Sequence, residues 1–176
     1  MNIQTNTLAR LASAIGMGNP YRWQADAHSV LLSGQTPGAI KAPTGAGKTA
    51  FMLCWLAALM DQAVARRVTL QRRYVVAINR RALVDSASDM AMRLVSALEL
   101  PELADLRAAL SCLSASGSPL VVSTLRGQRA DSFEWATDPS APAIIASTPD
   151  MLGSRLLFGG YGLGRSRRAT HAGLLG

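Results

Sequence analysis

Short apolar runs alternate with longer stretches of helical periodicity along most of this chain. Four apolar runs, each followed by a polar turn, predict β-strands at residues 38–41, 74–78, 120–122 and 143–146. Apolar positions at helical spacing predict helices at residues 21–32, 48–65, 80–98 and 102–113. Because strands that alternate with long helices need crossover connections, the pattern predicts an α/β fold with a parallel sheet flanked by helices.

The length of 176 residues fits one hydrophobic core. Residues 1–36 form an N-terminal helical segment, residues 37–152 form the α/β lobe, and residues 153–176 form a tail rich in Gly and Arg. We expect this tail to be mobile, or ordered only by neighbours outside it, because its composition cannot bury a core by itself.

The apolar run at residues 50–60 has 11 residues, whereas a membrane-spanning helix needs about 20. The N-terminus also lacks the charged and then apolar layout of a secretion signal. We therefore expect a cytoplasmic protein with no membrane partner. Cys54 and Cys112 lie in apolar helical contexts without other metal ligands at a suitable spacing, so we expect reduced core cysteines.

Residues 42–49 read Ala-Pro-Thr-Gly-Ala-Gly-Lys-Thr between a predicted strand and a predicted helix, which is the context of a P-loop. Glycines let the backbone wrap around phosphates with its N–H groups pointing inward. Lys48 is expected to reach the β- and γ-phosphates, and the Thr49 hydroxyl is expected to bind Mg²⁺. The predicted phosphate-binding residues are Thr44, Gly45, Ala46, Gly47, Lys48 and Thr49.

The other predicted strands end in small hydroxyl residues, Gly and Arg. In a parallel sheet all strands end at one edge, where ligands bind, and such residues contact phosphate oxygens without reading bases. The candidate nucleic-acid contacts at these ends are Asn79, Arg80, Arg126, Gly127 and Thr148. Simpler interpretations stay open, because Arg80 and Arg81 fit a solvated helix start and residues 147–150 fit an ordinary helix cap.

The chain carries 18 Lys and Arg against 11 Asp and Glu, which gives a net charge of +7. A basic balance favours an anionic partner such as nucleic acid. However, the basic residues are 16 Arg and only 2 Lys, an imbalance that genomic base composition would also explain. Both interpretations of the charge stay open.

The P-loop, with Ala42 in its first position, resembles the first motif of the superfamily-two DExD/H-box helicases. Gln24, 24 residues before Lys48, resembles the adenine-reading glutamine of that family, and an amide can both donate to and accept from an adenine edge. The resemblance implies an incomplete RecA-like P-loop lobe that binds ATP with Mg²⁺ and one strand of nucleic acid. The family's nucleic-acid motifs are matched at residues 79–83, 126–127 and 148–152.

A looser resemblance points to one branch of these helicases, the CRISPR-associated helicase–nuclease of type I systems. It implies translocation along single-stranded DNA and a CRISPR effector complex as a partner. These residues do not supply the separate metal-dependent nuclease domain of that family. The stretches that carry the resemblance are residues 80–85, 133–135, 150–158 and 171–176.

Hydrolysis of ATP by this family depends on an Asp-Glu pair that holds Mg²⁺ and positions the attacking water. This sequence has no Asp-Glu pair, and Asp150, which Met151 follows, reads as a helix-start residue. We expect the N-terminal part of a longer ATP-dependent helicase, in which Lys48 and Thr49 are catalytic. On its own, this chain is expected to have weak or absent ATPase activity.

Two other functions fit parts of the sequence. A small P-loop kinase acting on a nucleoside or metabolite is compatible with the length and the P-loop, although Ala42 and Gln24 fit it poorly. A basic nucleic-acid-binding module with a relic P-loop is the non-catalytic alternative. The module would show no coupling between ATP and nucleic-acid binding.

Overall fold

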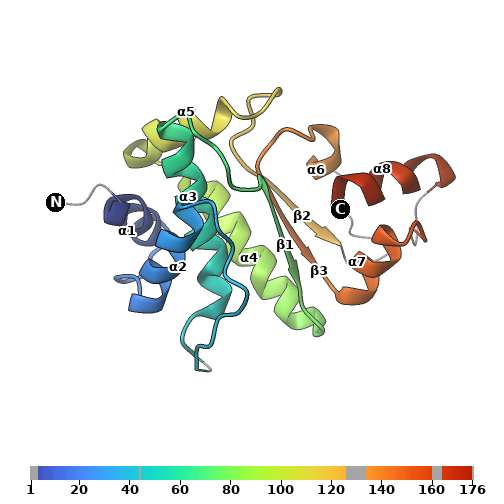
Figure 1. Cartoon of the computed structure of the whole chain (residues 1–176), viewed down its shortest axis with the longest axis horizontal. Helices are drawn as coiled ribbons and strands as arrows, with labels where there is room; N and C mark the ends of the chain where they lie inside the picture. The colour runs from blue at the N-terminus through green and yellow to red at the C-terminus, as the bar shows by residue number, and fades with distance from the viewer. Residues whose placement is uncertain (1–3, 44, 126–133, 160–163, 176) are drawn as a thin grey trace.

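A computed structural model of the chain describes residues 4–43, 45–125, 134–159 and 164–175. It has an α/β fold in which a small, three-stranded parallel sheet is flanked by helices (Figure 1). The strands are β1 (Arg73–Ala77), β2 (Val121–Leu125) and β3 (Ala143–Ser147). The helices are α1 (Gln4–Ala14), α2 (Arg22–Leu32), α3 (Phe51–Val64), α4 (Arg81–Ala97), α5 (Ala104–Ser111), α6 (Glu134–Thr137), α7 (Pro149–Leu156) and α8 (Arg165–Leu175), with the 3-10 turns η1 (Lys48–Ala50) and η2 (Pro101–Leu103).

The sheet has the strand order β1-β3-β2, and both outer strands pair in parallel with β3. All five residues of β3 are buried, as expected for a central strand with both faces covered. Its side chains alternate between the two faces. Ile144 packs into a large cluster with α3 and α4, whereas Ile145 packs into a smaller cluster with Ala136 of α6 and Leu175 of α8.

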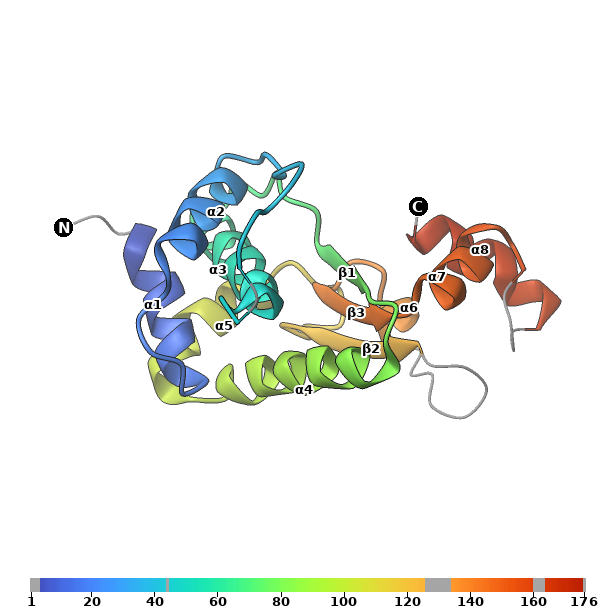
Figure 2. The ribbon, with the colours of Figure 1, turned by 90° about the horizontal axis from the view of Figure 1, so that it is seen from below.

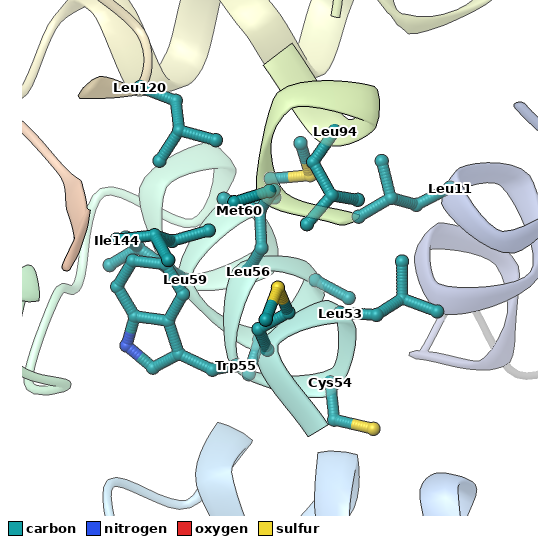
Figure 3. Packing of buried hydrophobic residues seen from close by; sticks show 14 of the residues in the cluster. Leu11, Leu53, Cys54, Trp55, Leu56, Leu59, Met60, Leu94, Leu120 and Ile144 are labelled. Carbon is teal, nitrogen blue, oxygen red and sulfur yellow. The ribbon is translucent and has the colours of Figure 1, made fainter. Parts of the chain in front are cut away.

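Helix α3 is the centre of the larger cluster (Figure 3). Its residues from Met52 to Met60 are all buried, and a helix that is apolar on every side has to be surrounded by other elements. Helices α1, α2 and α5 contact it, and Trp55 packs on Tyr74 of β1 with ring centroids 5.6 Å apart. This packing fixes the first turn of α3, and with it the end of the predicted P-loop.

The structure confirms three of the four predicted strands. The prediction of a strand at residues 38–41 is wrong, because this segment has no regular structure. Its only large apolar side chain is Ile40, and Ala39 and Lys41 are exposed. A strand needs a hydrogen-bonded neighbour, and β1, β2 and β3 pair only with one another among the residues that the structure describes.

The four predicted helices are present with small shifts at their ends, and the N-terminal segment is helical as expected. The structure of the tail differs from the prediction. The tail contains the end of α7, and most of its other described residues form α8. Helix α8 packs on α7 through buried groups, because Arg155 Nη1 lies 2.6 Å from His171 Nδ1. Composition alone does not reveal such a pair. The contact between Arg155 and His171 orders a segment that has few apolar side chains.

Two further findings concern the cysteines and the membrane. Cys54 is buried as predicted, but Cys112 is exposed, because it is the residue at which α5 ends, outside the apolar face that Leu106 and Leu110 form. Within the described ranges, no helix has both the length and the apolar character needed to cross a membrane.

Candidate functional site

The predicted P-loop forms a tight turn between the irregular segment after α2 and the turn η1. Gly45 has φ +84° and Gly47 has φ +69°, a left-handed conformation that favours glycine because a Cβ atom strains it. The turn is closed by two backbone hydrogen bonds, from Ala46 N–H to Pro43 O at 3.2 Å and from Ala50 N–H to Gly47 O at 2.9 Å. The glycine positions of the sequence motif are therefore the positions where the backbone requires glycine.

Lys48 folds back over the beginning of the turn. Its ammonium group donates to Ala42 O at 2.8 Å and to Pro43 O at 3.3 Å, while its side chain is exposed. Thr49 follows with an exposed side chain, and Thr44 lies outside the described residues. A phosphate group could replace the two carbonyl oxygens at Lys48, because an ammonium group prefers an anionic acceptor. Thr49 leaves its hydroxyl accessible to a metal ion carried by a nucleotide.

The beginning of α2 contacts the back of this turn. Gln24 is fully buried, and its Oε1 accepts a hydrogen bond from Tyr21 N–H at 2.9 Å. Its Nε2 is buried without a hydrogen-bond partner in the described part of the chain. This nitrogen lies 3.3 Å from the point where a Cβ atom would stand on Gly47. The structure thus brings Gln24 to the P-loop, although the amide faces the loop backbone rather than solvent.

Two aromatic residues that the sequence did not assign to the site complete this contact. The indole Nε1–H of Trp23 donates to Ala46 O at 2.9 Å, and the ring of Tyr21 lies 3.7 Å from the same Cβ position on Gly47. Tyr21 is 55% exposed, so one side of its ring faces solvent next to the loop. The sequence signal that could have identified both residues is their place just before the candidate Gln24, since aromatic side chains with a polar tip often contact polar groups.

The candidate nucleic-acid contacts follow the strands at one edge of the sheet. Ala77 pairs with Ser147 at the end of β1 and β3, and Ile78 N–H donates to Ser147 O at 2.9 Å. Asn79 and Arg80 after β1 are exposed, and Thr148 after β3 is partly exposed. The structure therefore brings these three positions to the same edge. Arg126 and Gly127, after β2, lie outside the described residues.

The loop does not follow a strand, so the structure does not place it at the carboxyl end of a strand as the sequence predicted. The turn η1 contacts α4, and α4 begins directly after Arg80. Figure 2 shows α4 along the underside of the sheet. Helix α4 is the element that connects the two halves of the candidate site.

The chain has no match among family models, curated proteins or solved structures. In the described residues, no group of three or more His, Cys, Asp and Glu side chains is arranged to hold a metal ion. The functional assignment therefore depends on the geometry of the loop, on α2 behind it and on the sheet edge.

Proposed function

We propose that this chain binds ATP with Mg²⁺ at residues 42–49 and one strand of nucleic acid at the ends of its parallel strands. In this proposal it is the N-terminal part of an ATP-dependent helicase or translocase of superfamily two, and its sheet belongs to a RecA-like lobe. The observation that carries the proposal is the contact between α2 and the loop. Gln24 and the P-loop are separate motifs in the sequence, and they are neighbours in the fold, since Gln24 Nε2 lies 3.3 Å from the point where a Cβ atom would stand on Gly47.

The loop offers the groups that a triphosphate needs. Two left-handed glycines turn the backbone, Lys48 supplies an exposed ammonium group, and the exposed Thr49 supplies a hydroxyl for Mg²⁺. Charge-assisted hydrogen bonds of this kind are each worth roughly 1.5–3 kcal/mol, so four or five of them support an affinity near micromolar after the costs of association.

The proposal assigns binding rather than turnover to this chain. Lys48 and Thr49 can hold phosphate and metal, but the chain has no Asp-Glu pair to position an attacking water. Single-stranded DNA is the appropriate nucleic-acid probe, since the looser resemblance is to a helicase–nuclease that moves along DNA.

The test compares the only two lysines of the chain, Lys48 and Lys41. Binding of a fluorescent ATP analogue with Mg²⁺ is measured by anisotropy for the wild type, Lys48→Ala and Lys41→Ala. We expect Lys48→Ala to weaken binding at least tenfold and Lys41→Ala, which removes the same charge from an exposed position, to leave it within twofold. An equal affinity of Lys48→Ala and the wild type, or no binding by the wild type, would overturn the nucleotide site.

A second measurement tests the coupling. The affinity for a fluorescent single-stranded oligonucleotide is determined with and without ATP and Mg²⁺. A helicase lobe is expected to show a different DNA affinity in the two conditions, because two sites that α4 connects share a coupling free energy. Equal DNA affinities would favour the non-catalytic nucleic-acid-binding module instead.

A further inference from the structure

Trp23 lies in the first turn of α2 and is half-buried. Its indole N–H donates to the carbonyl of Ala46 at 2.9 Å, across 23 residues of sequence. Ala46 stands between Gly45 and Gly47, which both have positive φ. Because glycine permits many backbone conformations, the peptide units of this turn need a contact from outside to hold one orientation.

The carbonyl that Trp23 holds determines where a neighbouring N–H group points. In a planar trans peptide the C=O and N–H bonds point in opposite directions. The Ala46 carbonyl and the Gly47 N–H belong to one peptide unit, so a carbonyl held against α2 turns the Gly47 N–H away from α2. No residue in the described part of the chain accepts a hydrogen bond from this N–H group.

The same peptide unit is also supported from behind. Gln24 Nε2 and the Tyr21 ring lie 3.3 Å and 3.7 Å from the point where a Cβ atom would stand on Gly47, so both side chains of α2 and its N-cap lie close behind the Gly47 backbone. The beginning of the turn differs, since the carbonyls of Ala42 and Pro43 face the ammonium group of Lys48. One half of the turn is therefore prepared for an anion, while the other half has to release Lys48 first.

We propose that Trp23 is a positioning residue of the nucleotide site, which turns the Gly47 N–H towards the phosphates by holding the Ala46 carbonyl. This inference rests on the proposed nucleotide binding. In this inference Trp23 affects the binding of the polyphosphate and does not affect the binding of the base. Loss of the indole N–H should therefore weaken the binding of ATP and of inorganic tripolyphosphate by the same factor.

The chain offers a matched control. The Trp55 indole also donates to a backbone carbonyl, that of Gln71 at 3.0 Å, but in the core between α3 and β1. Trp23→Phe and Trp55→Phe each remove one such hydrogen bond. We expect Trp23→Phe to weaken ATP and tripolyphosphate binding about fivefold, the effect of one hydrogen bond. Trp55→Phe is expected to lower the unfolding temperature and to leave both affinities within twofold.

A spectroscopic measurement on the wild type keeps the test valid if Trp23→Phe fails to fold. The indole N–H resonances of the three tryptophans are followed by ¹⁵N NMR during titration with tripolyphosphate and Mg²⁺. The Trp55→Phe and Trp135→Phe spectra identify the Trp55 and Trp135 resonances, so the third resonance is that of Trp23. We expect the Trp23 resonance to shift in proportion to occupancy, because the anion approaches the peptide unit that it holds. The Trp55 resonance is expected to stay in place.

The outcomes separate the two proposals. If the wild type binds neither ATP nor tripolyphosphate, the proposed function fails. If the wild type binds both and Lys48→Ala does not, but Trp23→Phe binds as the wild type does or the Trp23 resonance does not move, the nucleotide site stands and the role of Trp23 is overturned. A loss in Trp23→Phe that is confined to ATP would also overturn it, because the effect would then concern the base.

Discussion

The amide nitrogen of Gln24 lies 3.3 Å from the point where a Cβ atom would stand on Gly47. Gly47 also has φ +69°, so two independent features disfavour a larger side chain at this position. One is conformational and costs about 1–2 kcal/mol for a residue with a Cβ atom. The other is steric, because the fully buried Gln24 side chain would have to shift by a few tenths of an ångström.

We therefore expect Gly47→Ala to lower the free energy of unfolding by about 1–2 kcal/mol and to abolish ATP binding. Gly18→Ala is the control, since Gly18 has no atom within 4 Å of its Cβ position. Urea unfolding, followed by circular dichroism, measures both variants. A Gly47→Ala protein as stable as Gly18→Ala would contradict the conformation described for the loop.

The two cysteines should differ strongly in reactivity. Burial raises the pKa of the Cys54 thiol to about 12, and thiolate is the form that reacts with disulfide reagents. Cys112 is exposed. With an aromatic disulfide reagent at pH 8, we expect the folded protein to react quickly at Cys112 and to expose Cys54 only in denaturant. A Cys112→Ser protein that still reacts quickly without denaturant would show that α3 is not packed as described.

Asp138 connects two loops and should make stability depend on pH. It accepts hydrogen bonds from Ser140 N–H at 2.9 Å and from Ser116 N–H and Ser114 Oγ–H at 2.8 Å each, and also from the Ser140 hydroxyl. These hydrogen bonds, those from Ser140 above all, hold the pKa of the Asp138 carboxyl well below its usual range. In the unfolded chain the pKa of an aspartate is about 3.9.

Because folding lowers this pKa, the carboxylate stabilises the protein fully above the unfolded value, and the contribution is lost as the pH falls below it. We expect the advantage of the wild type over Asp138→Asn in free energy of unfolding to be constant between pH 5 and pH 7 and to shrink by pH 3. Asp89→Asn, at an exposed position of α4, is the control for charge. An advantage that does not change between pH 7 and pH 3 would contradict these hydrogen bonds.

Sequence patterns predicted the elements that their own residue types favour strongly. Runs rich in β-branched residues, such as Val75 and Val76 or Ile144 and Ile145, became strands. The segment at residues 38–41 did not, because pairing with a neighbour is a tertiary property that a run of four residues cannot ensure. Helix α8 was missed for a similar reason, since it depends on the buried contact between its residue His171 and Arg155 on α7.

Some features of the candidate site could also be predicted from the sequence, and others could not. The P-loop motif has glycine at positions 45 and 47, and both residues have the left-handed conformation that glycine permits without strain. The hydrogen bond between Trp23 and Ala46 was not predictable, since it depends on how α2 packs on α3. Nor did the pattern reveal that the turn η1 contacts α4, or that the described residues before the loop form no strand.

Arg80 provides the test of the sheet edge. Its carbonyl accepts hydrogen bonds from Leu83 N–H at 3.0 Å and Val84 N–H at 3.1 Å, which fix its backbone at the beginning of α4. Its side chain is exposed at the end of β1. A guanidinium group in this position can neutralise a phosphate without contacting a base.

Each neutralised phosphate releases counterions, so the logarithm of DNA affinity falls linearly with the logarithm of salt concentration. We expect Arg80→Ala to reduce this slope by about one unit for single-stranded DNA. The reduction should be the same for two oligonucleotides of unrelated sequence, because a backbone contact carries no base preference. Arg67→Ala, an exposed position beyond the carboxyl end of α3, should leave the slope unchanged. Anisotropy titrations at four salt concentrations measure the slopes, and equal slopes for Arg80→Ala and the wild type would remove Arg80 from the path of the nucleic acid.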